Sequence, residues 1–279
     1  MSYKSIVSFV NDHTMDMPTV LTAAGLAEQL QSHMTVVCLG IDRTNPGAYY
    51  GGANAIALQQ SLDDAEAEAL ANERAVAATL GVWSFPWETL PITAQVGALA
   101  PVVGDQAQLS DLVVLPKPYG GQRGVEDVVI LESALFRTRV PVLVIPEGHD
   151  TAPKAKRIII AWNESIEALA AVRSALPLLT AADMVDIAII DPPTHATDRS
   201  DPGGALAEML SRHGVRGDVS VLAKTMPRIS DILCRHCEDK DADMVVMGAY
   251  GHSRFREAIL GGATRNMLEM ATVPVLMAH

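Results

Sequence analysis

Three strand-like segments occur twice along the chain, in the same order each time. The pairs are residues 4–11 with 156–163, 111–115 with 243–247, and 140–143 with 273–276. A repeat of this length constrains the architecture before any single motif does. The chain is therefore predicted to contain two copies of one folding unit. Each copy opens with a strand that ends at Asn and closes with a VPVL strand.

Helical patterns lie between the repeated strands. Residues 17–31 and 167–179 carry apolar side chains at the spacing of one helix face, although Pro177 weakens the prediction for the last turn of the second helix. The strands are continuous apolar runs, which are typical of a parallel sheet covered on both faces. This alternation predicts two α/β domains, at residues 1–147 and 154–279, because residues 146–153 have the composition of a linker.

The first copy is longer than the second. The additional residues fall between Asp42 and Gly81, where a run rich in Ala, Glu and Leu occupies residues 53–80. The corresponding stretch after Asp191 is short and rich in Pro, Asp and Thr. We therefore expect the largest difference in length between the two domains in this region.

The composition excludes several classes of protein. The formal net charge is -12, so the chain as a whole repels nucleic acid and anionic membranes. No apolar run approaches the roughly 20 residues that span a bilayer, and the apolar part of the N-terminus is too short for a secretory signal. Three cysteines do not make a disulfide framework in 279 residues. We expect a soluble, reduced, cytoplasmic protein that binds neither nucleic acid nor membranes.

A glycine-rich stretch, GAYGHSRFREAILGGAT, begins at Gly248 directly after an apolar strand. Ligands of open α/β sheets lie at the carboxyl ends of strands, and glycine lets the backbone approach a ligand closely. Gly261 and Gly262 precede a predicted helix at residues 263–271, whose free N–H groups would form an anion site. Arg254, Arg256 and Arg265 add positive charge, opposed mainly by Glu257. The stretch therefore has the features of a phosphate-binding site.

A tight turn with a close helix–sheet contact would explain the same glycines, and on spacing alone the two interpretations carry equal weight. The chain contains no GxxxxGK[ST] segment, so it has no ordinary P-loop, and it contains no GxGxxG dinucleotide fingerprint.

The spacing of Gly248, Gly251 and Gly261 resembles the G-x2-G-x9-G-[S/T] nucleotide-binding signature of the universal stress proteins. The D-hydrophobic strand before it and the VPVL strand after it agree with that family, and the repeat extends the resemblance over essentially the whole chain. A tandem universal stress protein implies two open, parallel, five-stranded sheets with helices on both faces, an adenine-nucleotide alpha-hydrolase-like fold. It also implies that the closing strands, at residues 140–145 and 273–277, pair with each other in an intramolecular pseudo-dimer, and a further homodimer is expected.

The resemblance implies that the C-terminal domain binds ATP, or ADP or AMP, with Mg²⁺ as an accompanying ion and with a sensory or regulatory role in a stress response. The implied nucleotide-binding residues are Asn163, Met247, Gly248, Gly251, His252, Ser253, Arg254, Gly261, Gly262, Ala263 and Thr264. Two positions depart from the family pattern. Gly262 replaces the Ser or Thr after the third glycine, where Thr264 could substitute, and Asn163 replaces an acidic residue that would meet the adenine.

The N-terminal copy departs further from the signature. Pro116 and Tyr119 stand where the first two glycines would be, and alignment back from VPVL places Val128 and Val129 opposite the glycine pair. Proline lacks an N–H and valine shields the backbone. We therefore predict that this domain does not bind nucleotide in the family's way. The cluster Lys117, Gly120, Gly121, Arg123 and Gly124 could form another anion site, although a surface loop is the favoured interpretation.

Other features favour no particular chemistry. Cys234 and Cys237 form a CxxC on a predicted helix with only His236 between them, which is too few ligands for zinc and more typical of structural cysteines. Trp162 is interpreted as a packing residue. We find no nucleophile elbow, HExxH segment or obvious carboxylate pair, and therefore predict neither catalytic residues nor a metal site. Two alternatives to nucleotide sensing stay open: a nucleotide-free interaction or scaffold module of the same fold and, ranked last, an enzyme limited to slow ATP hydrolysis or self-phosphorylation.

Overall fold

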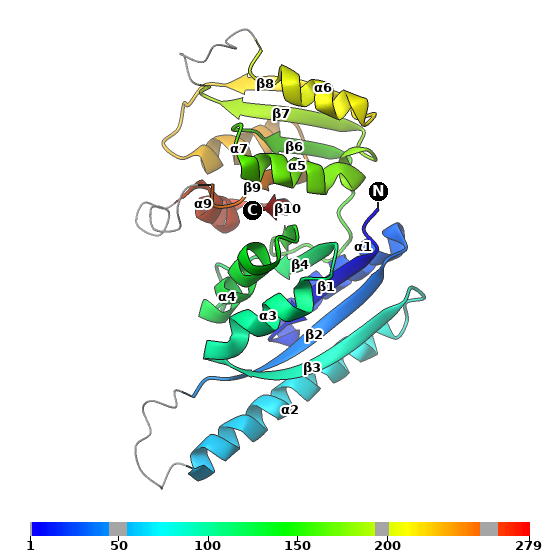
Figure 1. The fold of residues 1–279 in the computed structure, drawn as a ribbon, viewed down its shortest axis with the longest axis vertical. Helices are drawn as coiled ribbons and strands as arrows, with labels where there is room; N and C mark the ends of the chain where they lie inside the picture. Colours follow the sequence, from blue (N-terminus) through cyan, green and yellow to red (C-terminus); the bar gives the residue numbers. More distant parts are fainter. Residues whose placement is uncertain (1, 45–54, 193–200, 252–261) are drawn as a thin grey trace.

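A computed structural model describes residues 2–44, 55–192, 201–251 and 262–279. These residues form one ten-stranded sheet in the order β3-β2-β1-β4-β5-β10-β9-β6-β7-β8, with helices on both faces (Figure 1). We call residues 2–147 the N-terminal half and residues 154–279 the C-terminal half. Among the described residues, no helix is long and apolar enough to cross a membrane.

The two halves have the same strand order. The strands of the N-terminal half are β1 (Ser5–Val10), β2 (His33–Asp42), β3 (Trp87–Gln95), β4 (Leu112–Pro116) and β5 (Val142–Ile145). Those of the C-terminal half are β6 (Arg157–Ala161), β7 (Met184–Ile190), β8 (Gly217–Leu222), β9 (Met244–Gly248) and β10 (Val275–Ala278). Pairing within each half is parallel throughout. The repeat in the sequence therefore corresponds to a repeat in topology, and the α/β prediction is confirmed.

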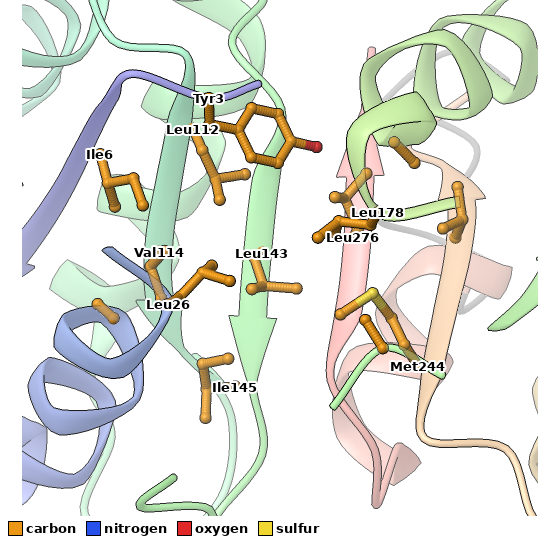
Figure 2. Packing of buried hydrophobic residues seen from close by; sticks show 14 of the residues in the cluster. Tyr3, Ile6, Leu26, Leu112, Val114, Leu143, Ile145, Leu178, Met244 and Leu276 are labelled. Atoms are coloured by element: carbon orange, nitrogen blue, oxygen red, sulfur yellow. The ribbon is translucent and has the colours of Figure 1, made fainter. Parts of the chain in front are cut away.

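The closing strands join the halves. β5 and β10 are antiparallel, with Leu143 opposite Leu276, so the two five-stranded parallel sheets are continuous with each other. The predicted pairing of the VPVL segments is confirmed. Figure 2 shows Leu143 on β5 extending toward Leu276 across this junction, and Ile145 belongs to the same buried cluster.

Among the described residues, four helices cover each face of the sheet. One face is packed by α1 (His13–Leu30), α2 (Ala55–Leu80), α5 (Ile166–Leu179) and α6 (Gly204–Arg212). The other is packed by α3 (Leu99–Ala107), α4 (Val125–Ser133), α7 (Ile229–Asp239) and α9 (Ala263–Met270), with short turns at Val96–Ala98 and Ala134–Thr138. The helices predicted around residues 17–31, 167–179 and 263–271 are all present, and α5 continues to Leu179 despite Pro177.

The difference in length between the halves lies where the sequence predicted it. α2 has 26 residues, whereas its counterpart α6 has 9. In Figure 1, α2 runs along β2 and β3 and projects past the end of the sheet.

Both hydrophobic cores extend across the junction between the halves. On one face, Ile6 and Val114 belong to the same buried cluster as Ile158 and Leu276. Tyr3 adds a polar contact, because its hydroxyl donates to the carbonyl oxygen of Ser174 on α5 at 2.6 Å. Burial of about 25 cal/mol per Å² of apolar surface stabilises such a junction, so the halves are packed as parts of one core rather than linked only by a tether.

Candidate functional site

A cavity of about 430 Å³ opens at the carboxyl ends of the central strands of the C-terminal half. It lies where the strand order reverses, since β6 has β7 on one side and β9 on the other, and such switch points are the usual ligand sites of α/β sheets. The lining residues are Ala161, Trp162, Asn163, Ser165, Ala188, Ile190, Ile229, Leu233, Met247, Gly248, Gly251, Gly262, Ala263 and Thr264.

Most of the nucleotide-binding residues that the resemblance implies line this cavity. The ones that line it come from three separate stretches of the described chain: Asn163; Met247, Gly248 and Gly251; and Gly262, Ala263 and Thr264. His252, Ser253, Arg254 and Gly261 lie outside the described residues.

The two glycines of the first loop have different roles. A Cβ on Gly248 would lie 2.5 Å from the backbone nitrogen of Ala168, so only glycine allows α5 to pack this closely on the end of β9. A Cβ on Gly251 would meet mainly the Glu167 carboxylate, at 3.1 Å, which is the movable end of a side chain. Gly248 therefore fits the tight-contact interpretation, whereas Gly251 faces the cavity with no backbone atom close to it.

The start of α9 forms one wall of the cavity. Gly262 is the N-cap of the helix and has no side chain, so the N-cap residue provides no side-chain acceptor for the first-turn N–H groups. Thr264 is buried, and its Oγ1 accepts a hydrogen bond from the Tyr250 N–H at 3.0 Å. This bond connects α9 to residues 248–251, which we call the glycine loop. The Thr264 hydroxyl keeps its own hydrogen for donation, as required of a substitute for the Ser or Thr that Gly262 replaces.

Asn163 follows β6 at the opposite wall. Its Oδ1 accepts from the Ser165 N–H at 3.2 Å, and Ser165 in turn caps α5 by accepting from the Ala168 N–H at 3.0 Å. Because the carbonyl end of the Asn163 amide is engaged, its NH₂ group is the end available to a ligand. An aspartate here would present only acceptors, so the substitution changes which ligand atoms this wall can bind.

The inner part of the cavity is apolar, and the sequence did not identify the residues that form it. Ala188 and Ile190 project from β7, and Ile229 and Leu233 from α7, so a flat apolar group could pack between strand and helix. The only signal was alternation on a strand beside β6, since Ala188 and Ile190 share a face. Trp162 packs against the core, as predicted, and also lines the cavity.

Arg265 does not contribute its charge to the cavity. Its Nε donates to Glu269 Oε1 at 2.9 Å, and its guanidinium carbon lies 5.3 Å from the ring centroid of Tyr119 in the N-terminal half. The positive charge expected from Arg265 therefore faces the other half of the molecule. Arg254 and Arg256 lie outside the described residues.

The equivalent position in the N-terminal half is almost filled. The cavity there is about 10 Å³ and is lined by Phe9, Asn11, Asp16, Leu115, Pro116, Asp127 and Ile130. In the register of the repeat, Phe9 stands at the place of Ala161 and Pro116 at the place of Gly248. Asp16 corresponds to Ala168. Larger side chains thus occupy the volume that is open in the C-terminal half.

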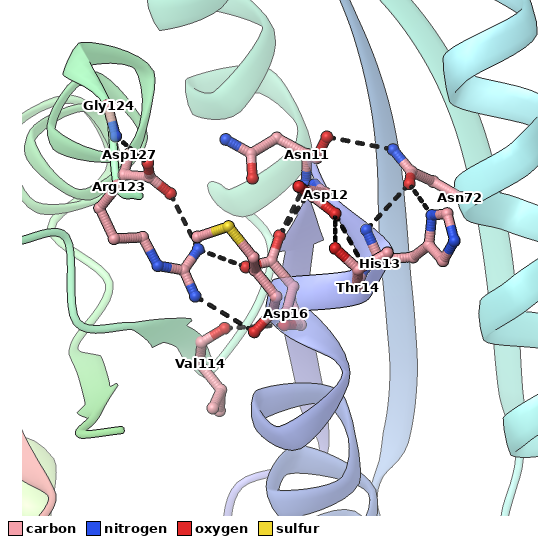
Figure 3. Close-up of polar contacts among 12 residues, drawn as sticks. Asn11, Asp12, His13, Thr14, Asp16, Asn72, Val114, Arg123, Gly124 and Asp127 are labelled. Carbon is pink, nitrogen blue, oxygen red and sulfur yellow. Dashed lines mark hydrogen bonds and ion pairs between the residues drawn. The ribbon is translucent and has the colours of Figure 1, made fainter. Parts of the chain in front are cut away.

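Arg123 forms ion pairs with two of the residues that line this position, Asp16 and Asp127 (Figure 3). Its Nη1 pairs with the carboxylates of Asp16 and Asp127, the latter at 3.1 Å, and its Nη2 donates to the Met15 carbonyl oxygen at 3.3 Å. The Arg123 side chain is only 7% exposed and that of Asp16 only 1%. The preference for a plain surface loop at residues 117–124 is therefore wrong for Arg123, whose guanidinium is buried against two of the chain's own anions.

The start of α4 corrects the alignment of the glycine pair. α4 begins at Val125 with Gly124 as its N-cap, so Gly124 is the counterpart of Gly262, and Val128 and Val129 lie inside the helix. The alignment failed because α4 continues into a π-helical turn, Ala134–Thr138, before the closing strand. Arg123 consequently occupies the place in the sequence that Gly261 has in the other half.

The electrostatics of the Arg123 cluster reflect its burial. Burial raises the pKa of the Asp16 carboxyl, although Arg123 opposes that shift. Burial lowers the pKa of Arg123, and the carboxylates of Asp16 and Asp127 more than offset this effect, so its pKa is raised overall. Asp16 also accepts from the backbone N–H groups of Asn11 and Asp12, at 3.0 and 3.2 Å. These bonds fix the carboxylate where the corresponding residue of the C-terminal half, Ala168, has none.

The CxxC segment lies on α7, in its contact with α9. Cys234 Sγ is 3.9 Å from Met267 Sδ, and Cys237 is buried. Burial raises the pKa of both thiols, that of Cys237 to about 12. Within the described ranges, no group of three His, Cys, Asp or Glu side chains is placed to hold a metal ion.

Comparisons with known proteins agree with this geometry. The model of the universal stress protein family matches residues 154–279. A curated universal stress protein of Synechocystis sp. is 26% identical over 141 residues, which cover 49% of this chain. The match spans 46% of that relative, about half its length.

Solved structures extend the likeness to the whole chain. A universal stress protein of Archaeoglobus fulgidus aligns with a TM-score of 0.64 at 13% identity, covering 98% of this chain and 95% of that one. A functionally unknown protein of Pseudomonas aeruginosa aligns with a TM-score of 0.58 at 13% identity, covering 99% and 92%. At these identities the structures establish the shared fold. Residues 154–279 are a domain of the universal stress protein family, and the N-terminal half repeats the fold of that domain.

Proposed function

We propose that the C-terminal half binds ATP, or a related adenine nucleotide, in the cavity between β6, β7 and β9, as a regulatory ligand in a stress response. The observation that carries the proposal is the form of this cavity. Apolar residues of β7 and α7 line one part of the cavity, and Gly248, Gly251 and the start of α9, whose N-cap is Gly262, line another. Backbone N–H groups at a helix start bind phosphate without help from side chains.

The cavity has an appropriate size and polarity for a nucleotide. Small-molecule sites of proteins are usually about 300–1,000 Å³, mostly apolar and furnished with a few placed polar groups. Here those polar groups are the Asn163 amide, the Thr264 hydroxyl and the backbone of residues 262–264. The Asn163 NH₂ group donates to a ring nitrogen of the base, and Mg²⁺ accompanies the triphosphate.

In the same proposal, the N-terminal half is a domain without a nucleotide. Its counterpart of the cavity is reduced to about 10 Å³ beside Phe9 and Pro116, so it contributes the junction with β10 and the shared core instead. The two halves then act as an intramolecular pseudo-dimer with domain limits at residues 1–147 and 154–279. A nucleotide-free interaction module is the second candidate, because both departures from the family signature, Gly262 and Asn163, lie on the cavity wall.

Gly251→Val tests the site. The branched side chain would project into the cavity beside the phosphate end, and the residue it meets is the movable Glu167 carboxylate, so the fold should tolerate it. We expect ATP affinity, measured by calorimetry, to fall by at least about 10-fold, equivalent to ~1.4 kcal/mol. Gly97→Val is the matched control, because a Cβ on Gly97 meets nothing within 4 Å and the residue lies in the N-terminal half. Unchanged ATP affinity in a folded Gly251→Val variant would show that the nucleotide binds elsewhere.

A further inference from the structure

The glycine loop is held from outside its own half. Tyr250, between Gly248 and Gly251, is 8% exposed and belongs to the buried cluster on the face covered by α7 and α9. Its ring does not line the cavity. It packs on Phe136, a residue of the N-terminal half in the π-helical turn after α4, with ring centroids 5.1 Å apart and an interplanar angle of 57°.

Phe136 is also connected to Ala249, the residue before Tyr250, through the side chain of His279. Its ring lies edge-on to His279, with centroids 4.8 Å apart. The Nδ1 atom of His279 is 2.9 Å from the carbonyl oxygen of Ala249. One N-terminal side chain therefore contacts the ring of Tyr250 and the group that hydrogen-bonds Ala249, the two residues between the glycines.

A second contact from the N-terminal half is made to the start of α9, which also lines the cavity. The ring of Tyr119, in the N-terminal half, lies under the guanidinium of Arg265 in the first turn of α9. The glycine loop and the start of α9 are connected to each other by the hydrogen bond from the Tyr250 N–H to Thr264 Oγ1. In Figure 1, α9 lies on the side of the C-terminal half that faces the N-terminal half.

The backbone at Tyr250 explains why such support matters. Tyr250 has a φ of 54°, in the left-handed region that non-glycine residues seldom adopt. A residue persists in this region when its surroundings over-determine its conformation. Phe136 and Thr264 supply those surroundings, so the loop conformation that shapes the cavity depends on a contact between the halves.

We propose that Phe136 and Tyr119 are positioning residues for the cavity of the C-terminal half, so that ligand affinity depends on contact with the N-terminal half. This inference rests on the proposed function for its ligand. The ring of Phe136 holds Tyr250 in place, and the ring of Tyr119 holds Arg265 and the start of α9. By linkage, a ligand that needs this arrangement also tightens the contact between the halves.

The full chain carrying Phe136→Ala tests the proposal by two readouts. We expect ATP affinity, measured by calorimetry, to fall roughly 10-fold, within the usual range of coupling between sites. We also expect hydrogen exchange at the Tyr250 amide to accelerate in the ligand-free protein, because the loop loses its support. Phe136→Tyr keeps the aromatic ring and should restore both quantities, and Tyr119→Leu should weaken ATP binding by a smaller factor.

Phe85→Ala is the matched control. Phe85 is another aromatic residue of the N-terminal half, paired with Trp83 at 5.7 Å and absent from the cluster that contains Tyr250. It should leave ATP affinity and exchange at Tyr250 unchanged. Wild-type affinity and exchange in a folded Phe136→Ala variant would overturn the inference. If the wild-type protein binds no ATP, the proposed function fails, and the exchange readout alone decides whether Phe136 positions the loop.

Discussion

The two halves of this chain share a strand order but differ at the carboxyl ends of their central strands. In the C-terminal half, Ala161 and Gly248 border a cavity of about 430 Å³. In the N-terminal half, Phe9 and Pro116 occupy the corresponding places, and about 10 Å³ is left. The same fold thus has an open cavity at these strand ends in the C-terminal half and a nearly filled one in the N-terminal half. The comparison shows that side chains at the strand ends, such as Phe9 in place of Ala161, go with a large difference in open volume on the same scaffold.

The filled position in the N-terminal half contains buried charges that neutralise one another. A phosphate in the open cavity would bring negative charge to the start of α9. In the N-terminal half, Asp16 and Asp127 bring carboxylates to the start of α4, and Arg123 neutralises them. The chain therefore places an internal ion pair near the position at which the other half is proposed to hold an anion.

The largest expected effect on the free energy of unfolding comes from removing the Arg123 guanidinium, which pairs with Asp16 and Asp127 in the N-terminal half. Arg123→Gln would leave the Asp16 and Asp127 carboxylates buried without a cation, which typically costs about 3–5 kcal/mol. Chemical denaturation would measure the loss in free energy of unfolding. The matched control is Arg212→Gln, which removes an exposed i,i+4 pair with Glu208 and should cost about 0.5 kcal/mol or less.

The pH dependence of the Arg123→Gln variant checks the cause of its instability. The folded-state pKa of Asp16 is already raised by burial, and loss of Arg123 would raise it further. A carboxyl whose pKa is raised by folding destabilises the folded state above its unfolded-state pKa, and this penalty disappears as the carboxyl protonates. The stability difference from wild type should therefore narrow on acidification from neutral pH. A constant difference would contradict the charge explanation.

Transplanting the filling residue into the open half should have the next largest effect. Ala161→Phe places in the C-terminal cavity the ring that Phe9 places in the N-terminal half. ATP affinity, measured by calorimetry, should fall by about 100-fold or more, equivalent to ~2.7 kcal/mol. Ala161→Ser adds one small atom and should leave affinity within a few-fold of wild type. Normal ATP binding by Ala161→Phe would break the comparison, because the cavity would then not be the binding site.

The smallest predicted effect concerns the caps of α9 and α4. Gly262→Ser restores the residue type of the family signature and adds a hydroxyl at the cavity wall, so ATP affinity should rise by about 2–10-fold. Gly124→Ser makes the same change in the filled half and should leave ATP affinity as it is. Each variant should change the free energy of unfolding by only a few tenths of a kcal/mol. Equal gains in affinity from both variants would contradict the assignment of the site to one half.

The repeat in the sequence predicted the architecture because each unit carries the same strands in the same order. The contact between β5 and β10 was expected from the resemblance to the universal stress proteins. The glycine spacing pointed to residues that line the C-terminal cavity, such as Gly248 and Gly262. The apolar recess was not predicted, because Ala188 and Ile229 belong to no motif and meet only through packing. The alignment at Val129 failed because an inserted π-helical turn shifts the helix without any sequence signal.

The burial of Arg123 shows a further limit of reasoning from a local pattern. Its neighbours Gly120, Gly121 and Gly124 are typical of a surface loop, and two of them do adopt positive φ in a turn. Its partner Asp16 lies 107 residues earlier in the chain. A pair so distant in sequence becomes visible only when β1 and β4 are placed side by side, as they are in the sheet.

The most direct test of the difference between the halves is the number of ATP molecules bound per chain. Nucleotide-stripped full-length protein should be titrated with ATP and Mg²⁺ by calorimetry, with Gly251→Val titrated in parallel. We predict one site per chain, lost or strongly weakened in Gly251→Val. Two sites would contradict the claim that the N-terminal position is filled by side chains such as Phe9 and Pro116. No binding would contradict the proposed nucleotide binding and favour the interaction module.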